Sequence, residues 1–386
     1  MYWIRRKINY YFAKELQIVR RLDYILLYKF FCLMTKANSR QILILSESRE
    51  QLSGNLKYID EKIDKNKYKV EYFFKNSIML KSTFSEKKKL CKLMASSKFI
   101  LVDDFIPLMY PIPLRKGTRF IQVWHAMGAF KKVGFSRLGK NGGPSPRSLT
   151  HKNYTDAIVS SMDIRKNYAE AFGISIDKVH AIGIPRTDIF FNECYKNTIR
   201  EELYEKYPQL KEKKVILFAP TFRGSGVKTA HYDYSWISFE KLEEKLGNEY
   251  IFLVKMHPFV KEIPKEQIAS DFFINLSQER EINDLLFITD ILVTDYSSVI
   301  FEYALLRKPI IFFCYDLELY DRGFYLPYDE SLPGKIAESQ EKLIEYLIAD
   351  NRNNLGETYD MFVEKYMGAC DGKSTERIVA LIEAYL

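Results

Sequence analysis

The stretch "LVTDYSSVIFEYALLRKPIIFF", residues 292–313, decides the fold class of this chain. An apolar run of strand type ends at Thr294, a polar turn follows, and apolar residues at helical spacing begin at Val299. A second apolar run begins after Pro309. A strand, a turn, a helix and another strand form the repeating unit of a parallel sheet. The stretch therefore predicts an α/β protein.

Short apolar runs bounded by turns recur on both sides of a charged, helical connection at 191–212. The strands expected from them are 41–48, 69–74, 98–104, 119–125, 157–161 and 179–185, then 214–222, 250–258, 272–277, 290–298 and 309–316. The runs do not alternate apolar with polar residues, which indicates strands that are buried on both faces. We expect two doubly wound, Rossmann-like α/β domains facing a cleft, with ligands beyond the carboxyl ends of the strands.

The predicted organisation has four segments. A basic amphipathic leader precedes an N-terminal Rossmann-like domain, a C-terminal Rossmann-like domain and a C-terminal helix. Their ranges are 1–40, 41–195, 196–365 and 366–386. A chain of 386 residues with 47% hydrophobic residues can bury two cores of this size. The five cysteines are scattered without a CxxC pair, which is typical of reduced thiols in a cytosolic protein. No group of side chains has metal-ligand spacing, so we expect neither metal nor cofactor.

The positive charge of the chain is concentrated in the leader. The formal net charge is +8, and residues 1–40 hold nine Lys/Arg against Glu15 and Asp23, a net of +7. The other 346 residues therefore carry about +1. This distribution argues against a protein whose main partner is nucleic acid, because such proteins are basic over the binding domain.

The leader has the spacing of an amphipathic helix and no run of roughly 20 apolar residues that could span a membrane. Residues expected to share its apolar face are Trp3, Tyr11, Ile18, Leu22, Ile25 and Leu26. Large apolar residues with Arg and Lys between them favour the surface of an anionic membrane. Packing of these residues into the following domain, and binding to nucleic acid, are the alternatives.

Chemically reactive side chains gather where the predicted strands end. These residues are His125, Thr221, Arg223, Lys255, His257, Asp295, Ser297 and Ser298. The carboxyl ends of parallel strands lie at one edge of a sheet, so we expect these groups to line one cleft.

Ser297 and Ser298 would begin a helix, where free backbone N–H groups and hydroxyls suit a phosphate. Serine at this position is more often an ordinary helix cap. With Arg223, Lys255 and His257 arriving from neighbouring strand ends, a diphosphate site becomes the better interpretation. Asp295 is expected to fix the turn or to hold a neighbouring cation.

The two strand-end histidines have different expected roles. His125 is placed to act as a general base on a hydroxyl nucleophile. His257, with a lysine two residues before it, is placed to stabilise charge on a leaving phosphate. We interpret His151, His180 and His231 as structural or surface residues.

Several motifs together resemble the CDP-glycerol:poly(glycerophosphate) glycerophosphotransferases, which include teichoic-acid polymerases and primases. The matching stretches are "QVWHAMGAFKKVGFS" (122–136), "GIPRTDIFF" (183–191), "LFAPTFRG" (217–224), "VKMHP" (254–258), "DLLFITDILVTDYSSVIFEYALLRKPIIFF" (284–313) and "YDRGFYLPYDE" (320–330). They follow the order of the family across roughly residues 118–335.

The resemblance implies a GT-B-like fold of two domains and peripheral attachment to the cytoplasmic face of the cell membrane. It also implies transfer of glycerol phosphate from CDP-glycerol to a lipid-linked acceptor or growing polymer, with release of CMP. His125 and His257 match the family's motif histidines. Carried over, His125 is the base, and His257 contacts the diphosphate with Arg223, Ser297 and Ser298, joined by Arg322.

The sequence departs from the family pattern beside the proposed base. Many members read "WHGTPLKKLG" where this chain has "WHAMGAFKKVG", and Glu302 stands where Asp is common. CDP-ribitol is therefore an alternative donor, and a nucleotide-sugar glycosyltransferase or epimerase is an alternative reaction. A membrane-binding or RNA-binding scaffold without activity is the least favoured alternative. The expected partners are the CDP-polyol, the lipid-linked acceptor and an anionic membrane, without nucleic acid; a homo-oligomer is left open.

Overall fold

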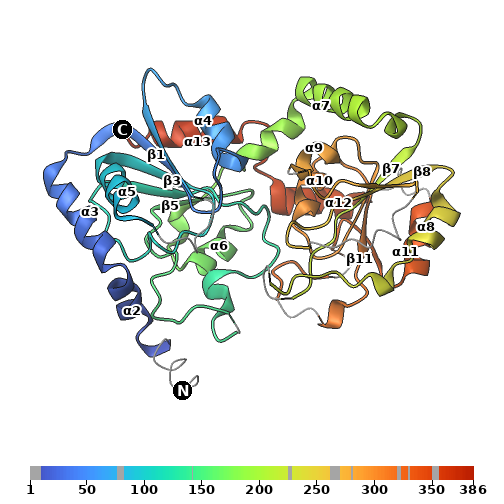
Figure 1. Cartoon of the computed structure of the whole chain (residues 1–386), viewed down its shortest axis with the longest axis horizontal. Helices are drawn as coiled ribbons and strands as arrows, with labels where there is room; N and C mark the ends of the chain where they lie inside the picture. Colours follow the sequence, from blue (N-terminus) through green and yellow to red (C-terminus); the bar gives the residue numbers. More distant parts are fainter. Residues whose placement is uncertain are drawn as a thin grey trace. The chain divides into compact units, whose positions relative to one another are not determined.

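The computed structural model of the chain describes residues 10–75, 82–140, 142–224, 228–260, 270–279, 281–319, 323–328, 331–349 and 356–386. The chain forms two compact units, shown in Figure 1. The first unit contains Met1–Asp188, Phe324–Leu326 and Lys365–Leu386, and the second contains Ile189–Gly323 and Pro327–Glu364. The C-terminal residues therefore return to the first unit.

The first unit is built on a six-stranded parallel sheet with the order β2-β1-β3-β4-β5-β6. Its strands are β1 (Asn38–Ser46), β2 (Lys69–Phe74), β3 (Ser97–Val102), β4 (Arg119–Gln122), β5 (Asp156–Val159) and β6 (Val179–Ala181). Residues 42–45 of β1 are fully buried. Burial on both faces of the sheet explains why this run is continuously apolar.

Helices cover both faces of this sheet. They are α2 (Ala13–Arg20), α3 (Leu22–Met34), α4 (Gly54–Lys62), α5 (Phe84–Ser96), α6 (Arg165–Phe172) and α13 (Ser374–Glu383), with 3₁₀ turns η1 (Gly134–Arg137) and η2 (Ile176–Lys178). Thr83 and Glu86 form a reciprocal capping box at the start of α5. Figure 1 shows α3 running alongside α5, with which it shares most of its contacts.

The second unit repeats the plan with the strand order β12-β11-β10-β7-β8-β9, again all parallel. Its strands are β7 (Lys214–Phe218), β8 (Tyr250–Val254), β9 (Phe273–Asn275), β10 (Ile291–Thr294), β11 (Ile310–Phe313) and β12 (Gly334–Ala337). Its helices are α7 (Glu193–Lys206), α8 (Phe239–Leu246), α9 (Ile282–Leu286), α10 (Val299–Ala304), α11 (Gln340–Ile348) and α12 (Gly356–Met367), with 3₁₀ turns η3 (Pro185–Phe191), η4 (Pro208–Lys211), η5 (Tyr234–Trp236) and η7 (Leu317–Leu319).

One core cluster of the second unit lies between its sheet and the helices α8 and α11. Ile216 and Phe218 of β7 point to this side, where Leu242 of α8 and Leu343 of α11 are fully buried. The prediction of two Rossmann-like units with parallel sheets is confirmed.

Every predicted strand except 69–74 ends earlier than expected, and for two of them the backbone shows why. The strand predicted at 119–125 ends at Gln122, because Trp124 adopts a left-handed backbone conformation (φ +50°) that no strand continues. The strand predicted at 179–185 ends at Ala181, and Pro185, which has no N–H to donate, begins η3. His125 therefore lies in a turn beyond the strand.

The leader forms two helices, α2 and α3, over its described part, and residues 1–9 with Trp3 lie outside the described residues. The expected shared face is wrong in one respect. Leu22 and Leu26 are exposed, whereas Ile25 is buried with Tyr24, Tyr28 and Phe31. The reason is that α3 packs against α5, so its other side faces out. Within the described ranges, no helix combines the length and apolar character that crossing a membrane requires.

Candidate functional site

His125 lies in the first unit, three residues beyond the end of β4. Its Nδ1 is 3.2 Å from the carbonyl oxygen of Asp103 and 3.5 Å from the carboxylate of Asp104. Both neighbours are acceptors, so Nδ1 carries the proton of the neutral ring. Nε2 then has the lone pair that a general base needs.

The surroundings of His125 keep its ring neutral. Burial lowers the pKa of His125 below its usual 6.5, and the positive charges of Arg186 and Arg49 act in the same direction. The carboxylate of Asp104 opposes this shift. A ring that is neutral at physiological pH can accept a proton from a hydroxyl.

An ion pair that the sequence analysis did not select lies beside His125. Asp103 is fully buried, and its Oδ2 is 3.0 Å from Nη1 of Arg49. Burial raises the pKa of Asp103 to about 6, and Arg49 opposes that rise. The signal for Asp103 and Asp104 was present, since both follow an apolar strand run as His125 does. Nothing local in the sequence pairs Arg49 with them.

Arg223 lies in the second unit between two carboxylates. Its Nε and Nη2 donate to the two oxygens of Asp316 at 2.6 and 2.8 Å, and its Nη1 donates to Asp295 at 2.9 Å. The guanidinium also lies over the rings of Tyr296 and Tyr315. Burial lowers the pKa of Arg223, but the two carboxylates outweigh it and raise the pKa above its usual value.

These contacts make Arg223 an anchor for the strand-end turns. Two negative charges face one positive charge, so the cluster itself does not attract an anion. The sequence predicted Arg223 as a diphosphate ligand, a role that would require it to exchange one of these bonds.

Asp295 organises the turn after β10. Its Oδ1 accepts from the backbone N–H of Thr221 at 2.7 Å and of Tyr296 at 2.5 Å, while its Oδ2 holds Arg223. The hydroxyl of Tyr328 donates to its carbonyl oxygen at 2.6 Å. One buried carboxylate thus ties the ends of β7 and β10 together, and Thr221 takes part through its backbone.

Lys255 and His257 follow the end of β8. Nζ of Lys255 donates to the carbonyl of Ser277 at 3.3 Å, and burial lowers the pKa of this lysine. The ring of His257 lies 4.6 Å from the rings of both Phe222 and Phe259. Its Nδ1 accepts from the backbone N–H of Phe259 at 3.2 Å, which places the proton of the neutral ring on Nε2.

Ser297 and Ser298 precede α10 and are half-buried. Ser298 occupies the cap position, but its hydroxyl makes no capping hydrogen bond. The hydroxyl of Ser297 accepts from the N–H of Val299 at 3.4 Å, a weak contact. An ordinary cap therefore does not account for Ser298.

The structure brings the predicted residues of the second unit to adjacent strand ends, because β10, β7 and β8 are neighbours in the sheet. His125 belongs to the first unit. Arg322 lies outside the described residues. His151 is buried among tyrosines with its pKa lowered to about 3 by burial, and His180 pairs with Asp156 at 2.9 Å.

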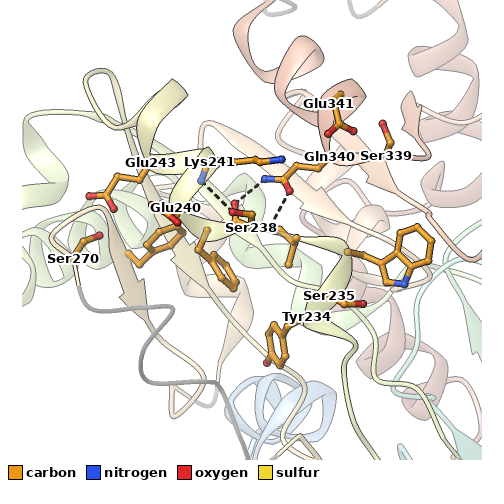
Figure 2. Close-up of a pocket in the computed structure, with 14 residues that line it drawn as sticks. Tyr234, Ser235, Ser238, Glu240, Lys241, Glu243, Ser270, Ser339, Gln340 and Glu341 are labelled. Atoms are coloured by element: carbon orange, nitrogen blue, oxygen red, sulfur yellow. Dashed lines mark hydrogen bonds between the residues drawn. The ribbon is translucent and has the colours of Figure 1, made fainter.

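A pocket of about 750 Å³ lies elsewhere in the second unit, beside the starts of α8 and α11 (Figure 2). The side chain of Gln340 joins these starts by accepting from the N–H of Ser238 and donating to its carbonyl. The charged residues that line the pocket are Glu240, Lys241, Glu243 and Glu341. Three carboxylates against one ammonium do not suit a diphosphate, and none of the predicted site residues lines this pocket.

A sequence model of the CDP-glycerol:poly(glycerophosphate) glycerophosphotransferases matches residues 26–384. The chain belongs to this family. The predicted family is thereby confirmed.

Three curated relatives illustrate the similarity. The chain is 47% identical over 348 residues to the teichoic acid poly(ribitol-phosphate) polymerase of Bacillus spizizenii, covering 88% of this chain and 56% of that protein. It is 44% identical to the ribitol-phosphate polymerase TarL of Staphylococcus aureus, covering 97% and 68%. A ribitol-phosphate primase of B. spizizenii is 35% identical, covering 93% and 95%. The chain thus spans little more than half of the first relative's length.

Two solved structures show how widely the fold is shared. The wall teichoic acid polymerase TagF is 25% identical with a TM-score of 0.75, and the match covers 97% of both chains. A UDP-GlcNAc 2-epimerase from Neisseria meningitidis is 14% identical with a TM-score of 0.56, covering 89% of this chain and 99% of that one. At that identity only the fold is shared.

Proposed function

We propose that this protein transfers a polyol phosphate from a CDP-polyol to the end of a lipid-linked polyol-phosphate chain and releases CMP. The family match over residues 26–384 is the observation that carries the proposal. The relatives named as ribitol-phosphate polymerases are 44–47% identical, whereas those named for glycerol phosphate are 29–36% identical. We therefore propose CDP-ribitol as the preferred donor, which was the alternative to CDP-glycerol in the sequence analysis.

In the proposed reaction, Nε2 of His125 accepts the proton of the acceptor hydroxyl while the hydroxyl oxygen attacks the phosphorus nearest the polyol. A new P–O bond forms, the P–O bond to the CMP oxygen breaks, and CMP leaves with the negative charge. Nε2–H of His257, the ammonium of Lys255 and the hydroxyls of Ser297 and Ser298 would stabilise that charge.

The opposite hydrogen-bond partners of the two histidines support this division of roles. Nδ1 of His125 faces acceptors, which favours a basic Nε2, and Nδ1 of His257 faces a donor, which favours a donating Nε2. Arg223 would act indirectly by holding the turn at Asp295. Arg322 stays a predicted ligand, and the predictions that no metal, cofactor or nucleic acid takes part stay predictions.

We also propose that α2 and α3 attach the protein to the cytoplasmic face of the membrane. Exposed apolar residues recur every three or four positions along one side of the two helices: Val19, Leu22, Leu26, Phe30 and Leu33. The adjacent helix α5 adds exposed Lys88, Lys89 and Lys92. An apolar stripe flanked by cations suits a surface of anionic lipid.

A donor panel tests the proposed activity. The purified chain is incubated with a lipid-linked ribitol-phosphate acceptor and, in parallel, with CDP-ribitol, CDP-glycerol and UDP-N-acetylglucosamine. Released nucleotide and product mass are measured. We expect CMP and a product extended by ribitol phosphate, with His125→Ala folded but inactive. Release of UDP with a glycosylated product, or normal turnover by His125→Ala, would refute the proposal.

A further inference from the structure

The residue immediately before His125 has a strained backbone. Trp124 has φ +50°, in the left-handed region that residues with a side chain rarely occupy. Such a conformation is unfavourable and persists only where surrounding contacts enforce it. The indole of Trp124 is buried and packs edge-on against Phe172. The ring alone does not determine the direction of the peptide group that leads to His125.

Two amide side chains hold the backbone of Trp124 from both sides. Oε1 of Gln122 accepts from the N–H of Trp124 at 2.9 Å. Nδ2 of Asn55 donates to the carbonyl oxygen of Trp124 at 2.5 Å, across 69 residues of sequence. Asn55 is 1% exposed, and its Oδ1 accepts from the N–H of Arg186 at 3.1 Å. Both polar ends of the Asn55 amide are therefore used on the backbone.

The position of Asn55 is itself fixed by the start of α4. Gly54 before it has φ +59°, and a Cβ there would lie 2.3 Å from Nη1 of Arg49. That guanidinium donates to the carbonyl of Ser53 at 2.8 Å and pairs with Asp103. The start of α4 is thus anchored to Asp103, the residue whose carbonyl oxygen faces Nδ1 of His125.

We propose that Asn55 is a positioning residue for His125, because its amide holds the strained Trp124 carbonyl and so sets the direction of the following residue. The inference rests on the role of His125 in the proposed function. The bond from Asn55 fixes the peptide plane between Trp124 and His125. With that plane fixed, Nδ1 meets the Asp103 carbonyl and Nε2 presents its lone pair outward.

The test replaces Asn55 by leucine, which has a similar size and no charge. We expect kcat to fall about 10–100-fold, as a misplaced catalytic group does, while KM for the CDP-polyol changes less than about twofold. Asn153→Leu is the matched control, because Asn153 in the same unit also donates to a backbone carbonyl, that of Met109, at 2.8 Å. The control should keep the wild-type kcat.

A histidine titration by NMR on selectively labelled protein gives a readout that does not need turnover. The fold lowers the pKa of His125, so a released ring should titrate closer to 6.5, at higher pH than in the wild type. If Asn55→Leu does not fold, Asn55→Ala serves for both measurements.

The outcomes separate the two proposals. A wild-type protein that releases no CMP refutes the proposed function, and a raised His125 pKa in the folded variant still supports the positioning role. An active wild type whose folded Asn55 variant keeps both kcat and the His125 pKa overturns the positioning role alone.

Discussion

At the scale of single residues, the proposed chemistry depends on which ring nitrogen each histidine turns toward the protein. A neutral imidazole offers one donor and one acceptor, so a neighbour at Nδ1 decides what Nε2 can do. Asp103 and Asp104 surround Nδ1 of His125 with acceptors, and the backbone N–H of Phe259 meets Nδ1 of His257. Neither contact is visible in the motifs around the two histidines.

The pH dependence of turnover follows from the pKa of His125. A base must be deprotonated, so activity is present above its pKa and is lost as pH falls through it. Because the fold lowers this pKa, we expect the acidic limb of kcat/KM to lie below pH 6.5. Asp104→Asn removes the charge that raises the pKa, so the limb should move to still lower pH. A limb that stays in place or rises would contradict this role of Asp104.

The guanidinium of Arg223 is predicted to stabilise the second unit. Arg223→Ala leaves the carboxylates of Asp295 and Asp316 without their cation, and breaking a buried pair in this way costs about 3–5 kcal/mol. Urea denaturation should show this loss. Arg307→Ala is the control, since Arg307 pairs with Asp360 on the surface and should cost under about 1 kcal/mol. Equal losses in the two variants would show that the buried ion pairs of Arg223 stabilise the protein no more than a surface ion pair does.

At the scale of elements, the two sides of α3 have different surroundings. One side packs on α5, and the other exposes Leu26 and Leu33 to solvent. An exposed apolar stripe of this regularity is unusual for a surface that meets only water.

The stripe should bind membranes. Leu26→Glu combined with Leu33→Glu should lower partitioning onto phosphatidylglycerol-containing vesicles at least about tenfold, because each buried leucine contributes about 1.5–3 kcal/mol. Co-sedimentation measures this. Met361→Glu, at an exposed apolar residue of α12, should bind like the wild type. If the double variant partitions as well as the wild type, α3 is not the attachment surface.

At the scale of the whole molecule, the chain leaves the first unit at Asp188, contributes Phe324–Leu326 to it, and returns at Lys365. The carboxylate of Asp188 accepts from the backbone N–H groups of Ser374 and Thr375 at 2.9 and 2.8 Å. It thereby caps α13, and Tyr385 near the end of the chain donates to Asp156 of β5 at 2.7 Å. These contacts hold the C-terminal segment of the chain against the earlier part of the first unit.

Removing the long-range cap should weaken the first unit. Asp188→Ala should cost about 0.5–2 kcal/mol in the free energy of unfolding, the usual range for loss of a helix cap. Thermal unfolding measures the loss, and Asp177→Ala, at an exposed carboxylate of the same unit, should cost less than about 0.5 kcal/mol. An unchanged transition in Asp188→Ala would mean that α13 docks without the cap.

The fold class was predictable, and candidate site residues could be proposed, because both rest on local patterns. Continuous apolar runs predict buried parallel strands, and polar residues at their ends predict a site at the carboxyl edge. The end of β4 was not predictable, since Val123 and Trp124 continue an apolar run and only packing and two amide bonds turn the backbone at Trp124. The ion pairs of Arg223 were not predictable, because its carboxylate partners are 72 and 93 residues away in the sequence.

By itself the sequence determined two parallel α/β units, the family, and the two histidines on which the proposed chemistry depends. These features follow from the order of residue types along short segments, so they can be recognised without knowing how the chain packs. Only the tertiary structure decided that Arg223 is held between two aspartates, that Asn55 reaches the carbonyl before His125, and that the C-terminal helix completes the first unit. Hydrogen bonds and ion pairs act over a few ångströms, and which distant residues come that close is set by how the whole chain packs.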